Sequence, residues 1–523
     1  MSVLLIHPPV VKPSEPPAGL AKLAGALSGH NIPYYILDAN IEGIVSLLNK
    51  TVDGPDKWTQ RARRNSARNL RGIRDRSLYE NPAKYRRVVE DICHLLDVSA
   101  APYDVKMSIA DYQDRNRSPV RSEDLLRAAE HPEANPFHGY FEERLDKLLR
   151  GGGYSMAGLS LNYLSQALTA FAILGFIKRR FPSLTIVLGG GLVTSWMKSP
   201  AWKNPFGGLV DHCVAGPGEA FLLSLLHKER QDGVHYQPDF RGFPINDYMA
   251  PGFILPYAAS TGCYWGRCSF CPERAEGNKY LQVPPRTVTA ELNRIAGDTK
   301  PGLIHLVDNA VSPAALRSIM TNQPTIPWYG FVRVTDDLTD PDFCKALRRS
   351  GCIMLKLGVE SGDQGVLDAM EKGTGVSQTS RALKALAKAG IATYIYLLFG
   401  TPYETEREAR TTLNFVAEHS QYITFLNAAV FNLPVNSPDA QGLELKSFYE
   451  GDLSLYTDFV HPKGWDRRRV RAFLDREFKR DPAIQSITRR QPPFFTSNHA
   501  ALFNGAHVAP STNKVRGASP SRS

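Results

Sequence analysis

The amino-acid sequence predicts an α/β protein with two parallel sheets. Short apolar runs alternate with amphipathic helical segments along most of the chain, which is typical of parallel strands joined by right-handed crossovers. Six such units follow residue 250, and they indicate a second sheet that is separate from the first. The chain has 523 residues, of which 43% are hydrophobic and 22% charged, so we expect a globular protein of two or three domains.

The first domain is expected at residues 1–235, with a polar, helix-rich insertion at about 41–150. Its first strand, helix and second strand fall within forty residues and form a βαβ unit. The pattern resumes after the insertion, where strands run into glycine-rich loops that let a backbone approach a ligand. In chain order, the expected strands with their exit loops are 3–7, 34–37, 157–162, 185–191 and 212–219, and the expected helices are 17–27 and 166–180.

The second domain is expected at residues 251–442, after a linker of turn-forming residues at 236–250. Its expected strands are 253–260, 303–307, 329–334, 353–359, 392–399 and 423–431, and its expected helices are 287–295, 341–349, 377–389 and 404–419. We expect a helical region at 443–490, with a basic amphipathic helix from Asp466 packed under the mouth of the second sheet. Hydrophobic periodicity stops after this region, so residues 491–523 are predicted to be a flexible tail.

Three of the seven cysteines lie close together as C-x4-C-x2-C, at Cys263, Cys268 and Cys271. Thiolates at this spacing can bind an iron–sulfur cluster or zinc. A structural zinc site needs a fourth Cys or His, and none follows in the next thirty residues. The pattern therefore favours a [4Fe-4S] cluster with one open iron, and three structural cysteines or a zinc knuckle are the alternative. The other cysteines are expected to pack in the core: Cys93, Cys213, Cys344 and Cys352.

This loop resembles the cluster loop of the radical S-adenosylmethionine (SAM) superfamily, which is usually C-x3-C-x2-C with an aromatic residue before the last cysteine. Phe270 occupies the aromatic position, whereas the first gap is one residue longer than usual. The resemblance implies that the second domain is a (β/α)6 partial TIM barrel. It also implies that SAM chelates the open iron and is cleaved reductively to methionine and a 5′-deoxyadenosyl radical.

In such barrels the chemistry lies at the carboxyl ends of the strands. The resemblance implies that Asp308 and Asn309 meet the amino group of SAM, and that Arg333 meets its carboxylate. Further implied SAM contacts are Phe270, Glu360, Ser361, Gly400 and Pro402. Ordinary structural roles are the alternative: helix caps for Asp308, Glu360 and Glu404 with Thr405, and a barrel salt bridge for Arg333.

The first domain resembles the Rossmann-like cobalamin-binding domain found upstream of many radical SAM barrels. The resemblance implies cobalamin contacts at Pro8, Pro9, Ser160, Asn162, Gly189, Gly190, Gly191, Gly216, Gly218 and Glu219. The Asp-x-His-x-x-Gly motif that supplies a histidine to cobalt is absent, so no protein histidine is implied below the corrin. Glycine turns occur in any doubly wound fold, and a domain that has lost its cofactor is the alternative.

Together these resemblances imply a cobalamin-dependent radical SAM enzyme that transfers a methyl group to an unactivated carbon. The reaction needs an electron donor such as flavodoxin or ferredoxin, and a second SAM to remethylate cobalt. Two alternatives stay open: radical cyclisation or rearrangement without methyl transfer, and a cobalamin- or cluster-based sensor that binds nucleic acid. No pattern in the sequence identifies the substrate, which is a small molecule or a peptide.

The net charge of +10 is partly local, because basic residues crowd the segment Lys57–Arg76. We interpret this segment as a solvated helix face and expect no nucleic-acid partner, with phosphate binding as the alternative. The apolar runs are shorter than the ~20 residues of a membrane span, and the N-terminus has no basic signal-peptide region. Seven cysteines, three of them clustered, favour the reducing cytoplasm.

Overall fold

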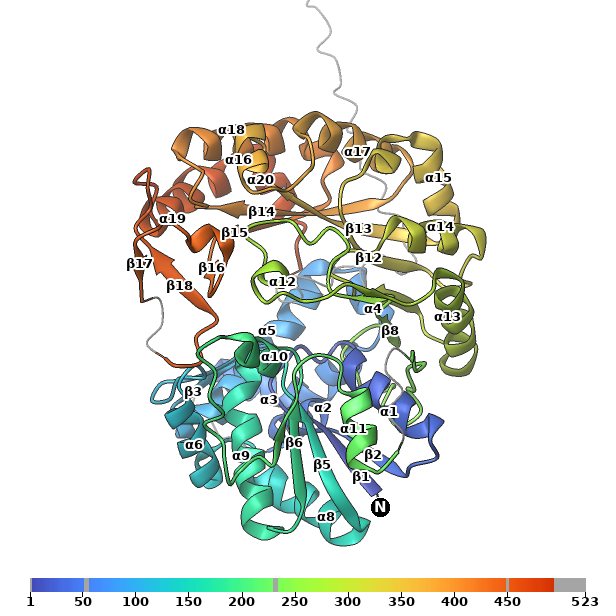
Figure 1. Ribbon diagram of the computed structural model, residues 1–523, viewed down its shortest axis with the longest axis vertical. Coiled ribbons are helices and arrows are strands. Elements are labelled where there is room, and N and C mark those ends of the chain that lie inside the picture. Colours follow the sequence, from blue (N-terminus) through green and yellow to red (C-terminus); the bar gives the residue numbers. More distant parts are fainter. Residues whose placement is uncertain (1, 51–55, 229–233, 448–450, 493–523) are drawn as a thin grey trace, which may run out of the picture.

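The computed structural model describes residues 2–50, 56–228, 234–447 and 451–492, and it contains the two predicted parallel sheets. The N-terminal sheet has the order β2-β1-β5-β6-β7, and Figure 1 shows it below the second domain. Its strands are β1 (Ser2–His7), β2 (Tyr34–Asp38), β5 (Tyr154–Ser160), β6 (Thr185–Gly189) and β7 (His212–Cys213). Its helices are α1 (Ala18–Gly29), α9 (Leu164–Arg180), α10 (Gly191–Lys198) and α11 (Glu219–Leu225).

Both faces of the N-terminal sheet are buried, as expected when helices cover each side. Successive side chains of β1 point to opposite faces, so Val3 and Leu5 belong to one hydrophobic cluster while Leu4 and Ile6 belong to the other. All four are at most 1% exposed. Burial of each such side chain contributes about 1.5–3 kcal/mol, which explains why this strand lies in the interior of the sheet, between β2 and β5.

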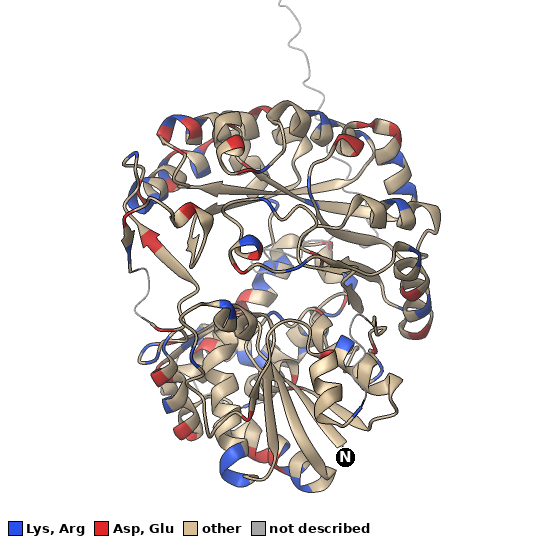
Figure 2. Ribbon diagram, viewed as in Figure 1, with Lys and Arg blue, Asp and Glu red and all other residues tan. Residues whose placement is uncertain are grey.

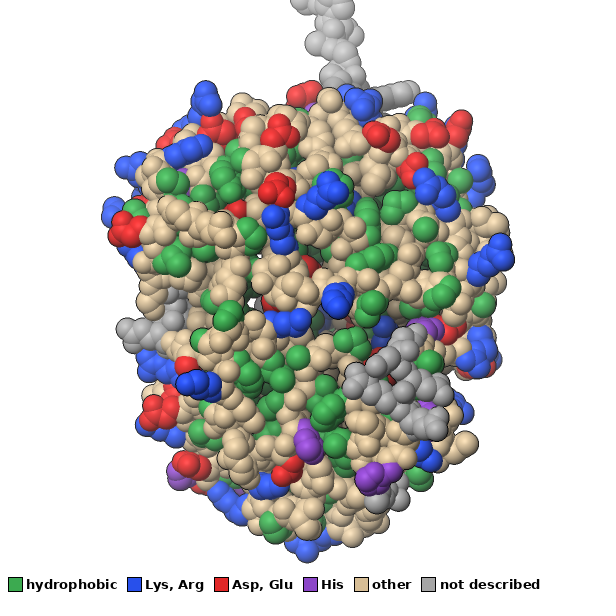
Figure 3. Space-filling view, viewed as in Figure 1, with side chains coloured by type: hydrophobic (Ala, Val, Ile, Leu, Met, Phe, Trp, Pro, Cys, Tyr) green, Lys and Arg blue, Asp and Glu red, His purple; other side chains and the backbone are tan. Residues whose placement is uncertain are grey.

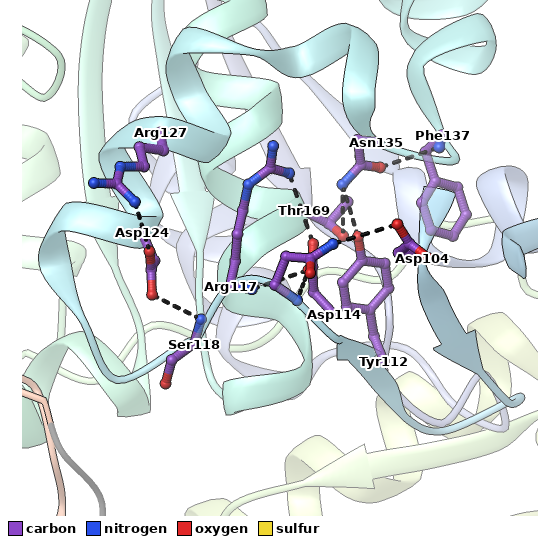
Figure 4. Close-up of polar contacts among 11 residues, drawn as sticks. Asp104, Tyr112, Asp114, Arg117, Ser118, Asp124, Arg127, Asn135, Phe137 and Thr169 are labelled. Atoms are coloured by element: carbon purple, nitrogen blue, oxygen red, sulfur yellow. Dashed lines mark hydrogen bonds and ion pairs between the residues drawn. The ribbon is translucent and has the colours of Figure 1, made fainter. Parts of the chain in front are cut away.

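The insertion contains the predicted helices and also a short hairpin, β3–β4, that the sequence analysis did not predict. Its elements are α2 (Ala39–Asn49), α3 (Lys57–Gly72), α4 (Arg76–Tyr79), α5 (Pro82–Ala100), β3 (Val105–Met107), β4 (Tyr112–Asp114), α6 (Ser122–Glu130), α7 (His138–Tyr140) and α8 (Asp146–Gly152). Figure 4 shows how polar contacts attach it: the buried Asn135 amide donates to Tyr112 Oη at 3.3 Å and to Thr169 Oγ1 of α9 at 3.4 Å. These contacts join the insertion to the domain core.

Helix α3 carries most of the crowded arginines on its exposed side. Its buried side is formed by small and polar residues and one leucine, namely Thr59, Ala62, Ser66, Asn69 and Leu70. Arg61 forms an ion pair with Asp91 of α5 at 2.8 Å, and Arg74 donates to the backbone carbonyl of Asp247 in the linker. The arginines therefore occupy a solvent-facing surface of the insertion. Figure 2 shows that charged residues throughout the molecule concentrate on helices and largely avoid the strands.

The second domain is an open barrel of six parallel strands, in the order β15-β14-β13-β12-β11-β8. The strands are β8 (Ile254–Tyr257), β11 (Leu303–Leu306), β12 (Trp328–Val332), β13 (Cys352–Glu360), β14 (Ala392–Phe399) and β15 (Phe425–Val430). The helices are α12 (Pro272–Ala275), α13 (Pro285–Thr299), α14 (Pro313–Thr321), α15 (Pro341–Arg349), α16 (Gln364–Ala369), α17 (Val376–Lys388) and α18 (Glu406–Glu418). A small hairpin pairs β9 (Ser260–Thr261) with β10 (Leu281–Gln282).

Strand β14 shows how the barrel separates its two faces. Thr393, Ile395 and Phe399 are fully buried under the outer helices. The alternate residues Tyr396 and Leu398 point to the inner face and are partly exposed. The inner face near the carboxyl ends of the strands is therefore accessible, whereas the outer face forms the core.

The C-terminal region differs from the prediction of helices alone, because it also contains a three-stranded antiparallel sheet. This sheet has the order β16-β18-β17, with β16 at Leu433–Pro434, β17 at Leu445–Lys446 and β18 at Tyr456–Phe459. Its strands are too short for an alternation of hydrophobic and polar residues to be recognised in the sequence. Helices α19 (Arg467–Arg476) and α20 (Pro482–Thr488) follow as expected. The tail predicted at 491–523 lies almost wholly outside the described residues, and none of the described helices is long and apolar enough to cross a membrane.

Candidate functional site

The three clustered cysteines lie on the loop between β9 and α12, at the carboxyl end of β8. Cys268 is 9% exposed, and Cys263 and Cys271 are half-buried. Burial raises the pKa of the Cys271 thiol to about 11. Burial also raises the pKa of the Cys268 thiol, but the nearby positive charges of Lys372 and Arg333 partly oppose this rise. In the described chain no three Cys, His, Asp or Glu side chains surround a single ion position. A [4Fe-4S] cluster does not need such a position, because each of three irons takes one thiolate. The three cysteines of this loop therefore fit a cluster.

The first half of the cluster loop is fixed by Asp308, which follows β11. Its buried carboxylate accepts the Ala259 N–H at 3.0 Å and the Ser260 hydroxyl at 2.5 Å. Burial raises the pKa of this carboxyl group. The neighbouring Asn309 amide donates to the Gly262 carbonyl at 3.4 Å. Both residues predicted to meet the amino group of SAM therefore contact the cluster loop, and neither serves as a helix cap.

The second half of the loop is fixed by Arg333 and the segment after α16. Arg333 donates to Cys268 Sγ at 3.7 Å and to the Lys372 carbonyl at 2.6 Å, and its guanidinium lies 4.1 Å from the centre of the Trp265 ring. Trp265 Nε1 donates to the Glu371 carbonyl at 3.1 Å. The ammonium group of Lys372 lies 5.6 Å from the centre of the Phe270 ring. Arg333 thus forms no carboxylate salt bridge among the described residues.

Glu360 and Ser361, at the end of β13, are also bonded within the protein. Glu360 forms a buried ion pair with Lys372 at 2.8 Å, from a backbone with a φ of 63°. Ser361 Oγ lies 3.1 Å from Thr412 Oγ1 of α18. Asp363, not Glu360, caps the following helix α16, because its carboxylate accepts the Val366 N–H at 3.0 Å. The acidic group at this strand end therefore neutralises a lysine beside the cluster loop.

The turn after β14 contains Gly400 and Pro402 and ends in Glu404. Gly400 adopts a φ of 82°, and its N–H donates to Glu404 Oε2 at 2.5 Å. Trp465 Nε1 donates to the same oxygen at 3.0 Å. Burial raises the pKa of Glu404 to about 7, and Glu404 Oε1 has no hydrogen-bond partner among the described residues. Thr405, rather than Glu404, is the N-cap of α18.

A cavity of about 1190 Å³ lies between the two domains. Eight of the ten residues predicted for cobalamin line it: Ser160, Asn162, Gly189, Gly190, Gly191, Gly216, Gly218 and Glu219. Pro8 and Pro9 do not line it, and the Pro8 carbonyl instead accepts the Gln166 side-chain N–H at 2.7 Å. Figure 3 shows an opening between the upper and lower halves of the molecule on this face. The cavity therefore joins the glycine loops of the N-terminal domain to the barrel.

The opposite wall of the cavity comes from residues on both sides of the cysteines, including Thr261 and Gly262 before them and Pro272 and Gly277 after them. Helix α10 contacts this wall directly, because Ser195 Oγ donates to Glu276 Oε1 at 2.6 Å. Figure 1 shows α12 at the junction of the two halves. A molecule in this cavity would therefore touch both the N-terminal domain and the loop that carries the cysteines.

Several glycines leave the cavity open for a large planar ligand. Gly216 has a φ of 74°, and no atom lies within 4 Å of a Cβ placed on it or on Gly19 and Gly277. Among the described residues that line the cavity, the one histidine is His235, whose Nε2 lies 2.8 Å from Glu291 Oε2. These residues fit a corrin whose metal takes no histidine from the chain. Helix α1 also lines the cavity, which the sequence analysis did not predict. A glycine in the first turn of this helix, Gly19, was the feature of the sequence that could have indicated it.

Comparisons with known proteins agree with this arrangement. The Radical SAM superfamily profile matches residues 257–416. The anaerobic magnesium-protoporphyrin IX monomethyl ester cyclase of Rubrivivax gelatinosus is 28% identical over 206 residues, which cover 38% of this chain and 36% of the relative. The bacteriochlorophyllide d C-12(1)-methyltransferase of Chlorobaculum tepidum is 25% identical over 194 residues, which cover 35% of this chain and 41% of that protein. The matches thus span less than half of either relative.

Among solved structures, the radical SAM methyltransferase TsrM from Kitasatospora setae, with cobalamin and a [4Fe-4S] cluster bound, has a similar fold. Its TM-score is 0.52 at 17% sequence identity, and the alignment covers 89% of this chain and 84% of TsrM. The similarity therefore includes both domains and their arrangement. This chain thus contains a radical SAM domain at residues 257–416, with the cysteine loop and the open six-stranded barrel, and its overall fold is similar to that of TsrM.

Proposed function

We propose that this protein is a cobalamin-dependent radical SAM enzyme that methylates an unactivated carbon. One observation carries the proposal: a single cavity is lined on one side by glycine loops of a Rossmann-like domain and on the other by residues that flank the three cysteines, including Gly262 and Pro272. Bound there, the cluster supplies an electron for SAM cleavage and cobalamin carries the methyl group. Two cofactors on one cavity suit a reaction that uses both.

The chain's own residues hold and shield this centre. Cys263, Cys268 and Cys271 bind the cluster through their thiolates. Asp308 holds the first half of the loop through two hydrogen bonds, and Arg333 holds the second half. The lining glycines admit the corrin. The partly exposed inner face near Tyr396 gives SAM and the substrate access to the barrel, and an external donor such as flavodoxin or ferredoxin supplies electrons.

The proposal is tested on anaerobically purified and reconstituted protein. Iron, sulfide and corrin are measured first, and the protein is then reduced in the presence of SAM. We expect about four irons and one corrin per chain, with formation of 5′-deoxyadenosine and S-adenosylhomocysteine. Protein that binds no iron and leaves SAM intact would contradict the enzyme function. Iron binding and SAM cleavage without corrin would show that the N-terminal domain has a structural role and binds no cobalamin.

Radical cyclisation is the second candidate, because relatives named magnesium-protoporphyrin IX monomethyl ester cyclase match this chain in three organisms. Their alignments cover at most half of each relative. The same experiment separates the two reactions. Methyl transfer consumes a second SAM and leaves S-adenosylhomocysteine, whereas cyclisation yields 5′-deoxyadenosine without it.

A further inference from the structure

The first gap of the cysteine loop contains four residues, Tyr264–Arg267, and the second of them, Trp265, packs inward against the barrel. The ring lies so close to Gly373 that a Cβ there would be 2.1 Å from Trp265 Cζ2. Gly373 also has a φ of 65°, which favours glycine. The indole N–H is bonded to the Glu371 carbonyl at 3.1 Å. The ring is therefore fixed in both position and orientation.

The fixed ring orients Arg333. Its guanidinium lies 4.1 Å from the ring centre, within the range of a cation–π contact. One terminal nitrogen donates to the Lys372 carbonyl at 2.6 Å, and the other lies 3.7 Å from Cys268 Sγ. Arg333 is only 6% exposed. A planar, permanently charged group is thus held against the sulfur of one cluster ligand with little water between them.

A charge in this position has a specific electrostatic effect. A cluster gains one negative charge when it is reduced, so a nearby cation and an N–H donor to a ligand sulfur stabilise the reduced form more than the oxidised form. The effect is strong because Arg333 is buried. Arg267 contacts the same ring at 5.1 Å, but its side chain is exposed and donates to no cysteine in the described structure.

We propose that Arg333, held in place by Trp265, is a positioning residue that raises the reduction potential of the cluster through Cys268. This role rests on the proposed function, because it requires a cluster at the three cysteines. It differs from the SAM carboxylate contact that the family resemblance implies for Arg333. It also gives the longer first gap of this loop a function, because that gap contains the tryptophan.

The test is a potentiometric titration of the reconstituted cluster without SAM, followed by EPR. Arg333→Gln should lower the ratio of reduced to oxidised cluster at least tenfold at a fixed potential, which is about 59 mV for one electron. Arg333→Lys, which keeps the charge but not the planar fork, should restore part of the loss. Trp265→Phe keeps the ring and loses the Glu371 bond, so it should give a smaller shift in the same direction.

Arg267→Gln is the matched control, because it removes an equal charge from the exposed side of the same ring. An equal shift in Arg267→Gln and Arg333→Gln, or no shift in Arg333→Gln, would contradict the role of Arg333 alone. If Arg333→Gln does not assemble a cluster, an unshifted potential in Trp265→Phe contradicts it. Wild-type protein without a cluster or without SAM cleavage would instead contradict the proposed function.

Discussion

The two walls of the central cavity are built in opposite ways. Behind the barrel side, the charged residues at the strand ends lie outside the described lining and are bonded to the protein itself: Asp308 to the loop before Cys263, Arg333 to Cys268 and Glu360 to Lys372. On the N-terminal side, the lining includes glycines, and two of them, Gly19 and Gly216, have no atom within 4 Å of a placed Cβ. The barrel side is therefore specialised for holding a loop rigidly, and the N-terminal side for admitting a large ligand.

This difference predicts different consequences of mutation. Changes on the barrel side should break buried interactions and release the cluster loop, whereas a larger side chain at Gly19 on the N-terminal side should fill the cavity without loss of stability.

Cys268→Ala should abolish cluster binding and SAM cleavage, because two thiolates are too few to hold the cluster. Iron content should fall from about four per chain to below one. Cys344→Ala is the control, since Cys344 is fully buried in α15 and its thiol is bonded to the Leu338 carbonyl at 3.3 Å. That variant should keep its iron, and loss of iron from both variants would indicate unfolding instead.

Lys372→Met should lower the free energy of unfolding by about 3–5 kcal/mol, because it leaves Glu360 charged and unpaired in a buried position. Chemical denaturation measures the difference. The exposed pair Lys345–Asp342 provides the comparison, and Lys345→Met should cost less than about 1 kcal/mol. Equal costs for the two lysines would show that the buried pair does not hold the loop.

Glu404→Gln should raise stability at neutral and alkaline pH. Burial raises the pKa of Glu404 from 4.5 to about 7, so the folded protein keeps the carboxyl protonated while the unfolded chain ionises. Stability due to this group is thus highest below pH 4.5 and falls as the pH rises to 7, by about 3 kcal/mol in total. The glutamine variant should lack this fall in denaturation curves at pH 5 and pH 8. An unchanged difference between the two pH values would contradict the buried, protonated carboxyl group.

Gly19→Leu should block corrin binding with no loss of stability. Gly19 begins helix α1, lines the cavity and has free space at its Cβ, and the replacement favours the helix by up to about 1 kcal/mol. Gly297→Leu, on helix α13 and away from the cavity, has the same freedom and should keep its corrin. Corrin and iron are measured in both variants, because loss of corrin with retention of iron would show that only the N-terminal side of the cavity is affected. Corrin retained in Gly19→Leu would place the cofactor elsewhere.

The fold was largely predictable from the sequence, because the strands of its two parallel sheets are short apolar runs separated by helices. The strand at 392–399 was predicted with its observed bounds. The short strands β3, β4, β10, β16, β17 and β18 were missed, since two to four residues show no clear periodicity. The partners of the site residues were not predictable either. That Arg333 meets Cys268, or that Lys372 neutralises Glu360, depends on contacts between segments far apart in the chain.

The central claim is that corrin and cluster occupy one cavity, and their magnetic interaction tests it most directly. Protein reconstituted with both groups is reduced so that cob(II)alamin and the reduced cluster are each paramagnetic, and EPR is recorded with each centre alone and with both. We expect spectra that are split or broadened by coupling when both are present, and loss of that coupling in Gly19→Leu. Spectra that equal the sum of two isolated centres would contradict it.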